Sequence, residues 1–382
     1  MNFEPLKAFL DYYLPILGIP GSDTVIYKDH VEVFRYTSGY DNLSRQTPMR
    51  RDLIYNIYSC TKVATCIAAT QLIERGEIVI SDPVYAYFPE FKNMTVKVKD
   101  QFGKVIGVKP AEETMQIRHL LTMTSGINYN MDTDAIKNVQ IVTGGRAPTQ
   151  DICRAIATEP LEFEPGRDYQ YGLSLDIIGG IVELVSGMKL SDYMAENIFL
   201  PLGMEDTAFR FDESKHERFA TQYDYNPETH SAVEIPYNNC KFRFGTEYDS
   251  GGAGLVSTVS DYVLLADALA NGGVGKNGNR ILSESGVRLM SSNALDEKQI
   301  KTFATNHNSG YGYGFGVRMN LDPTPSGNLA PIGEFGWDGA KLSYLSADPK
   351  NHIAVFHAEH MGGLHRVMIP RFRNLIYSCF EY

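Results

Sequence analysis

Residues 55–76 read YNIYSCTKVATCIAATQLIERG, and the interpretation of the whole chain starts from this stretch. Ser59 and Lys62 are three residues apart, so their side chains lie on one face if the segment is helical. A serine hydroxyl needs a base within hydrogen-bonding reach to act as a nucleophile, and a lysine whose pKa is lowered by burial can be that base. The pair is therefore a candidate for nucleophilic catalysis.

The residues around this pair predict a helix that begins near Ser59 and ends at Gly76. After Lys62 the helix is apolar on nearly every side, which is typical of a buried helix. A lysine in such a helix needs a structural or functional reason. The alternative, in which Ser59 is only an N-cap and Lys62 only a solvated residue of the first turn, stays open at this point.

A chain of 382 residues is expected to hold about one Ser-x-x-Lys by chance, and this one holds two. In the second pair, Ser186 and Lys189, Gly187 directly follows the serine, as at a helix end. Lys189 therefore need not face Ser186. We assign the chemistry to the first pair.

The composition, 43% hydrophobic and 21% charged, is that of a soluble globular protein with room for two domains. A net charge of -11 without a Lys/Arg run argues against nucleic acid or an anionic membrane as the partner. No apolar run approaches the roughly 18 residues of a membrane span. The start lacks a secretory pattern, so we expect a cytoplasmic protein. The five cysteines lack a Cys-x-x-Cys spacing and are expected to be reduced, buried thiols.

Strands are predicted near both ends of the chain and helices in the middle, which suggests one sheet built from both termini. Hairpins are predicted at residues 24–36 and 341–358, and residues 223–249 are expected to be polar and irregular. The predicted helices include 117–126 with a glycine stop, segments at Ile152 and Leu175, 192–198, 262–269, and a closing helix with Pro370 near its start.

A Ser/Lys pair also needs a group that protonates the leaving group and donors that hold the oxyanion. Tyr171 is placed for the first task, because the segment PGRDYQYGLS at residues 165–174 is a turn that runs into a helix start. A lysine ammonium beside this phenol is expected to pull its pKa toward neutrality. Taken alone, Tyr171 is equally read as a packing residue among 23 tyrosines.

Together these segments resemble the serine β-lactamase and penicillin-binding superfamily, with class C β-lactamases and the related esterases and D-amino-acid peptidases nearest in pattern. The segments that carry the resemblance are SCTK at 59–62, IVISDPVYAYFP at 78–89, IRHLLTMTSG at 117–126, PLGM at 201–204 and GAGLVST at 252–258. The resemblance implies an α+β fold, in which a five-stranded antiparallel sheet flanked by helices lies beside an all-helical domain. We expect residues 1–58 and 220–382 to form the sheet domain and 59–219 the helical domain, with the active site between them.

Carried over residue by residue, the resemblance makes Ser59 the nucleophile, Lys62 its base or proton relay, and Tyr171 the first residue of the Tyr-x-Asn motif. The third motif of the family aligns with Trp337-Asp338-Gly339, followed by Ala340. The backbone N–H groups of Ser59 and Ala340 would then form the oxyanion hole. No cofactor is implied.

Two substrate-binding positions depart from the β-lactamase pattern. Leu173 stands where the Tyr-x-Asn motif has asparagine, and Trp337 stands where a β-lactamase usually has lysine. Both changes suit a less polar acyl substrate, and the Trp-x-Gly sequence resembles that of the family's esterases. Asp338 should repel carboxylates and favour a cationic or amine-bearing substrate, whereas Lys341 would restore positive charge.

We therefore predict a serine hydrolase that forms an acyl-enzyme on Ser59 with a small ester, amide or peptide and has weak or no β-lactamase activity. The alternative is a non-catalytic module with the same fold that binds or senses a β-lactam or peptide. An α/β-hydrolase is disfavoured because no Gly-x-Ser-x-Gly occurs. The sequence does not indicate an oligomeric state.

A cluster of His357, Glu359, His360 and His365 suggests a metal site at first sight. It begins on a predicted strand, where successive side chains point to opposite faces, and continues into a glycine loop. The four groups need not converge, so no metal site is expected. His119 in the 117–126 helix is interpreted as a packing residue.

Overall fold

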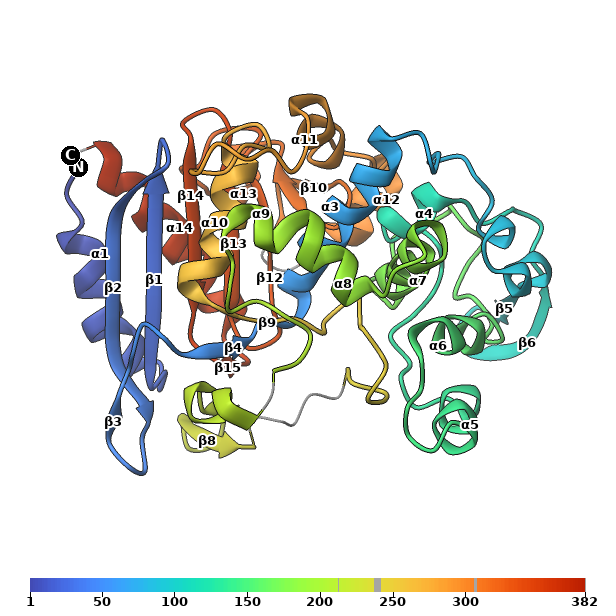
Figure 1. Ribbon diagram of the computed structural model, residues 1–382, viewed down its shortest axis with the longest axis horizontal. Helices are drawn as coiled ribbons and strands as arrows, with labels where there is room; N and C mark the ends of the chain where they lie inside the picture. Colours follow the sequence, from blue (N-terminus) through green and yellow to red (C-terminus); the bar gives the residue numbers. More distant parts are fainter. Residues whose placement is uncertain (212, 237–241, 306–307, 382) are drawn as a thin grey trace.

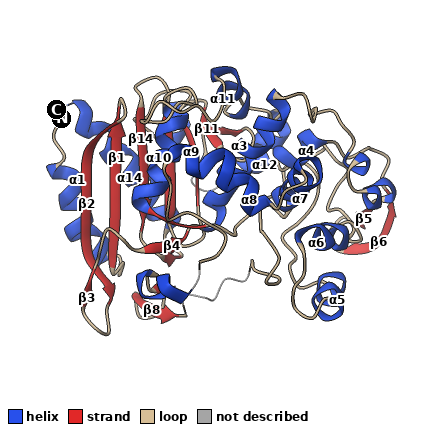
Figure 2. Cartoon of the chain, viewed as in Figure 1, coloured by secondary structure: helices blue, strands red, loops and turns tan. Residues whose placement is uncertain are grey.

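The computed structural model describes residues 1–211, 213–236, 242–305 and 308–381. A large sheet with helices on both faces occupies one side of the molecule, and a mostly helical region occupies the other (Figure 1, Figure 2). The two ends of the chain meet beside the sheet, where the Asn2 N–H donates to the Cys379 carbonyl over 2.8 Å.

Eight antiparallel strands form the large sheet in the order β10-β11-β12-β13-β14-β1-β2-β3. Their bounds are β1 Gly21–Lys28, β2 Val31–Asn42, β3 Thr47–Pro48, β10 Tyr311–Tyr313, β11 Arg318–Asn320, β12 Phe335–Asp338, β13 Ser343–Asp348 and β14 Ile353–Ala358. Both predicted hairpins, β1–β2 and β13–β14, are confirmed. Strand β1 pairs with β14, so the sheet is built from both ends of the chain, as predicted.

The predicted count of five strands is wrong, although the fold class is confirmed. Strands β2, β1, β14, β13 and β12 form the middle of the sheet, β3 adds an edge on one side, and β11 and β10 extend the other side. The added strands are two or three residues long. Such short runs contain too few residues to show the alternation by which strands are recognised in a sequence.

Alternating residues of the central strands pack on opposite faces of this sheet. Ile26, Tyr344 and Val355 belong to an apolar cluster with α1 (Glu4–Ala8), η1 (Phe9–Tyr13) and α14 (His365–Glu381). Their chain neighbours Leu345 and Phe356 belong to the larger core on the other face, where α10 (Val259–Ala270) crosses β1, β13 and β14. The sheet is therefore covered on both sides.

Helix α3 (Thr61–Glu74) lies at the centre of the molecule and packs against α7, α8, α11 and β12. Twelve of its fourteen residues are buried, which agrees with the prediction of an apolar, buried helix. It ends before Gly76, whose φ of +72° an L-residue rarely adopts.

The chain contains further helices besides α1, η1, α3, α10 and α14. They are α2 Leu14–Ile16, α4 Ile117–Leu121, α5 Asp134–Val142, α6 Thr149–Ile156, α7 Ser174–Ser186, α8 Leu190–Met194, η5 Ala195–Phe199, α9 Leu200–Leu202, α11 Glu284–Met290, α12 Glu297–Phe303 and α13 Pro323–Ser326, with short 3-10 turns η2 Tyr58–Cys60, η3 Val84–Ala86, η4 Pro89–Asn93 and η6 Glu213–Arg218. The helical region also contains the hairpin of β5 (Thr95–Lys99) and β6 (Val105–Pro110).

Two local predictions are wrong. The helix expected over residues 117–126 ends at Leu121, because Met123 adopts a φ of +57° and the chain turns before it reaches Gly126. The segment expected to be irregular contains the hairpin of β7 (Gln222–Asn226) and β8 (Ser231–Ile235), whose mostly polar, partly exposed residues carry little apolar alternation. Its residues 237–241 lie outside the described part of the chain.

Two small sheets complete the fold. Strand β15 (Met361–Gly362) pairs with β7, and β4 (Ile54–Asn56) pairs with β9 (Val256–Thr258). The second pair fixes the segment that enters η2. Among the described residues, no helix has both the length and the apolar character to cross a bilayer. The described cysteines Cys60, Cys66, Cys153 and Cys379 are buried and unpaired, and Cys240 lies outside the described residues.

Candidate active site

Ser59 lies in η2, a 3-10 helix of one turn that directly precedes α3. The preceding residue, Tyr58, has a left-handed φ of +46°, a conformation that costs about 1–3 kcal/mol outside glycine. The Tyr58 hydroxyl donates to the Gln222 side chain, which holds this turn against β7. Ser59 is 8% exposed, so its hydroxyl sits at the edge of the core with limited access to solvent.

Lys62 is fully buried in the first turn of α3, and its side-chain nitrogen contacts three oxygens. Nζ lies 3.3 Å from Ser59 Oγ, 3.3 Å from the Tyr129 hydroxyl and 2.6 Å from the Gly252 carbonyl. In its neutral form the amine has two N–H donors and one lone pair. With the donors on Gly252 and Tyr129, the lone pair is left for the Ser59 hydroxyl.

Burial lowers the pKa of Lys62 from 10.5 to about 8. The negative charge of Asp176 opposes this shift. Asp176 is itself buried, and its Oδ1 accepts hydrogen bonds from Tyr248, from Ser250 and from the backbone N–H of Gly252. Asp176 thus supports the glycine whose carbonyl accepts from Lys62. A substantial share of Lys62 is neutral near pH 7 to 8.

Tyr171 lies beside the same amine, with Lys62 Nζ 4.7 Å from the centre of its ring. Its hydroxyl accepts a hydrogen bond of 3.0 Å from Trp337 Nε1. Burial raises the pKa of Tyr171 above its ordinary value, and hydrogen bonds with Ser59 and Trp337 only partly offset that rise. The expectation that the lysine pulls this pKa toward neutrality is therefore wrong. The phenol stays protonated and can donate a proton.

The third sequence motif packs directly against the serine turn. Strand β12 ends with Trp337 and Asp338, and a Cβ added to Gly339 would come within 2.3 Å of the Ile57 carbonyl. Ser343 Oγ donates to the same carbonyl over 2.7 Å. This close approach, which only glycine permits, brings the turn at Ala340 next to η2. Within the described residues, the turn hydrogen bonds leave the Ala340 N–H without an acceptor.

The structure does not bring every predicted substrate residue to the serine. Leu173 is buried and lines a separate small cavity in the helical region. Lys341 donates to Asp224 and, over 3.0 Å, to the Tyr223 carbonyl, so its charge is already paired. Asp338 Oδ2 lies 3.9 Å from His365 Nε2, and its negative charge also contributes to the raised pKa of Tyr171.

A cavity of about 420 Å³ opens beside Ala340. Its wall is formed by Tyr58, Phe242, Lys341 and residues of the β7–β8 hairpin. The Phe242 ring also contacts Tyr129, at 5.6 Å between centroids. The cavity therefore adjoins the serine turn. Its lining is partly aromatic, and its one lysine, Lys341, is already paired with Asp224.

The four residues of the histidine cluster have different partners. His357 contacts Thr24 and Glu359, His360 contacts the Thr221 carbonyl, and His365 contacts the Gly339 carbonyl. Over the described part of the chain, no three His, Cys, Asp or Glu side chains come close enough to hold a metal ion. His119 is partly buried and accepts from the Gln116 N–H at the start of α4, so it has a structural contact.

Sequence reasoning missed three members of this site: Tyr129, Asp176 and Gly252. Tyr129 follows the glycine stop of a quoted segment by three residues, and Asp176 lies in the first turn of α7, five residues after Tyr171. Gly252 is the first residue of the segment at 252–258 that carries part of the family resemblance. Its contribution is a carbonyl oxygen, which no side-chain pattern reveals.

The family described as Beta-lactamase matches residues 8–358, and the chain belongs to that family. It is 29% identical to protein Rv1367c of Mycobacterium tuberculosis over 94% of this chain and 90% of that one. It is 28% identical to esterase EstB of Burkholderia gladioli over 87% of this chain and 84% of that one. The solved structure of EstCE1, a hydrolase with promiscuous acyltransferase activity, superposes with a TM-score of 0.77 at 22% identity, covering 97% of this chain and 96% of that one.

Proposed function

We propose that this protein is a serine hydrolase that forms an acyl-enzyme on Ser59 with small, uncharged esters. The observation that carries the proposal is the Lys62 amine, buried without an adjoining carboxylate contact and 3.3 Å from Ser59 Oγ. A buried lysine with two occupied donors and a lone pair directed at a hydroxyl has the properties of a general base.

In the acylation step, Lys62 Nζ takes the proton from Ser59 Oγ as that oxygen bonds to the ester carbonyl carbon. The carbonyl oxygen becomes an oxyanion, and the backbone N–H groups of Ser59 and Ala340 are the donors proposed to hold it. When the tetrahedral intermediate collapses, the bond to the alcohol oxygen breaks and that oxygen needs a proton. Tyr171, protonated and hydrogen-bonded with Ser59, supplies it and regains one from Lys62.

Deacylation repeats these steps with water in place of the alcohol. Lys62, neutral again, takes a proton from water as the water oxygen bonds to the acyl carbon. The bond between that carbon and Ser59 Oγ then breaks, Tyr171 protonates Oγ, and Tyr171 regains a proton from Lys62. The products are a carboxylic acid and the free serine. The Trp337 hydrogen bond fixes the phenol oxygen throughout this cycle.

The surroundings of the serine favour neutral esters over β-lactams. The cation that lines the adjoining cavity, Lys341, is paired with Asp224, so it offers little to the carboxylate of a β-lactam. At the position where a β-lactamase usually has a lysine, this protein has the uncharged indole of Trp337. Asp338, the next residue, adds negative charge. The relatives named an esterase and a hydrolase with acyltransferase activity support the same substrate class.

One preparation assayed with p-nitrophenyl butyrate and with nitrocefin tests this proposal. We expect turnover of the ester and slow or absent opening of the β-lactam. Fast nitrocefin turnover without ester cleavage would contradict the substrate class. Stable acylation without release of product would instead support a non-catalytic binding module.

Trp337→Phe is expected to lower kcat for p-nitrophenyl butyrate about tenfold, because it removes the N–H that orients the Tyr171 oxygen and keeps most of the ring surface. KM should change by less than threefold, since phenylalanine keeps most of the apolar ring surface of Trp337. The check is steady-state kinetics with circular dichroism to confirm folding. An unchanged kcat would show that Tyr171 does not depend on this hydrogen bond.

A further inference from the structure

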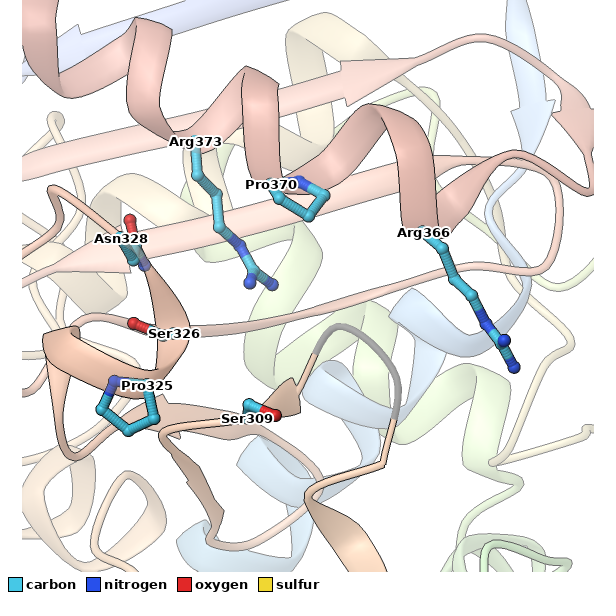
Figure 3. A pocket seen from close by; sticks show the side chains of 7 residues that line it. All are labelled: Ser309, Pro325, Ser326, Asn328, Arg366, Pro370 and Arg373. Carbon is cyan, nitrogen blue, oxygen red and sulfur yellow. The ribbon is translucent and has the colours of Figure 1, made fainter.

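A second cavity, of about 330 Å³, lies beside α14 rather than beside Ser59 (Figure 3). Its walls are α14 on one side and α13 with the segment before β10 on the other. The polar residues that line it are Ser309, Ser326, Asn328, Arg366 and Arg373. No carboxylate is among the described lining residues, and the volume falls at the lower end of the roughly 300–1,000 Å³ range of small-molecule sites.

Arg373 is the buried charge of this cavity. It is 3% exposed, and its guanidinium stacks between the rings of Tyr311 and Tyr344, at 4.7 and 5.6 Å from their centres. Nε donates to the Tyr344 hydroxyl over 3.2 Å. Nη2 is buried and finds no acceptor among the described residues. A charged donor in this position normally has a partner.

The neighbouring charges do not neutralise Arg373. Arg318 is fully buried on the other side of the Tyr344 ring and donates to Glu334 over 3.1 Å. Glu334 pairs with Arg318, and no ion pair among the described residues joins Arg373 to a carboxylate, which leaves the positive charge of Arg373 unpaired. Nε and Nη1 of Arg318 likewise lack acceptors among the described residues. The cluster is therefore electrostatically suited to an added anion.

Arg366 provides a second positive charge at the mouth of the same cavity. It is exposed, and it precedes Arg373 by seven residues, which places the two on one face of α14 about 10 Å apart along the axis. Figure 3 shows both side chains leaving the helix on the same side. Pro370 lies between them and lines the cavity.

We propose that this cavity binds a small organic dianion, either a dicarboxylate or a phosphate monoester, whose negative oxygens face Arg373 and Arg366. The hydroxyls of Ser309 and Ser326 donate to the carbonyls of Ala304 and Pro323, so they present oxygen lone pairs and a polar wall rather than further charge. A ligand of this kind balances the unpaired positive charge of Arg373. The site is independent of the reaction proposed for Ser59.

Isothermal titration calorimetry at constant ionic strength tests the site, with glutarate and glycerol 3-phosphate as dianions and acetate as the single-charge comparison. We expect millimolar or tighter binding of at least one dianion and at least about tenfold weaker binding of acetate. The stronger of the two dianions identifies the carboxylate or the phosphate as the preferred group. Absence of binding by both dianions at 10 mM would overturn the proposal.

Arg366→Gln should weaken dianion binding by about tenfold, as expected for the loss of a charged hydrogen-bond donor. The matched control is Arg371→Gln, which removes the same charge from the same helix at a residue whose guanidinium stacks on Tyr13 instead. If both variants weakened binding equally, the effect would come from the overall charge of the protein rather than from contact with Arg366, and the proposed site would be contradicted. Arg373→Met should abolish binding, and if it fails to fold, the Arg366 comparison still decides.

The Ser59→Ala variant tests whether the anion site is separate from the catalytic site. Because Ser59 does not line the α14 cavity, this variant should bind the dianion as tightly as the parent protein while losing esterase activity. Loss of dianion binding in Ser59→Ala would show that the titration reports the catalytic site. Failure of the anion proposal and failure of the hydrolase proposal are therefore distinguishable.

Discussion

Ser59→Ala is expected to lower kcat/KM for p-nitrophenyl butyrate by at least about 10⁴-fold, because removal of Oγ eliminates the only atom proposed to bond to the acyl carbon. The backbone N–H groups remain, so a small residual rate above that of water is expected. Folding should be retained, since the change deletes one oxygen at a site that is 8% exposed. The measurement is initial-rate kinetics on the parent and the variant prepared in parallel.

The chain offers a matched control in its second Ser-x-x-Lys pair. Ser186 lies at the end of α7 and donates to the Val182 carbonyl over 2.6 Å, as a helical serine commonly does. Ser186→Ala should leave kcat/KM within about twofold and cost at most about 1 kcal/mol of stability. If Ser186→Ala abolished activity and Ser59→Ala did not, the nucleophile would have been assigned to the wrong pair.

Lys62→Met is expected to lower kcat by about 10²–10⁴-fold, the usual contribution of a general base. Methionine fills much of the same buried volume and adds no charge, so the loss is chemical rather than structural. Lys62→Arg should be equally inactive, because a guanidinium stays protonated at all accessible pH values and cannot accept the serine proton. Full activity in Lys62→Arg would rule out the base role.

The pH dependence of the parent protein tests the same residue without a mutation. Only the neutral amine accepts a proton, and the pKa of Lys62 is about 8. The acylation rate should therefore rise with pH through a midpoint near 8 and level off above it, with about one-tenth of the maximum at pH 7. A pH-independent rate between 6 and 9 would contradict the assignment.

Several features of the fold were predictable because they depend on local pattern. The apolar run after Lys62 predicts the buried helix α3, and the regular alternation in β1, β2, β13 and β14 predicts two hairpins. The Ser59–Lys62 contact follows from helical spacing, since residues three apart share one face. These predictions need no knowledge of distant parts of the chain.

The rest depends on contacts between distant segments, which leave no local signal. Gly252 reaches Lys62 from 190 positions away, and the Trp337 hydrogen bond to Tyr171 spans 166 positions. The raised pKa of Tyr171 results mainly from burial, which cannot be read from the turn that contains it. The exact bounds of strands β10 and β11 depend on pairing with neighbouring strands, because three residues carry little pattern of their own.

Intact-protein mass spectrometry after rapid mixing with p-nitrophenyl butyrate and acid quench tests the central claim, a transient acyl group on Ser59, most directly. The account predicts one added butyryl group, which peptide mapping assigns to the segment containing Ser59. This adduct should disappear once the substrate is exhausted, and it should be absent from Ser59→Ala. An equal adduct on Ser59→Ala, or ester turnover without an adduct on the parent at any quench time, would contradict it.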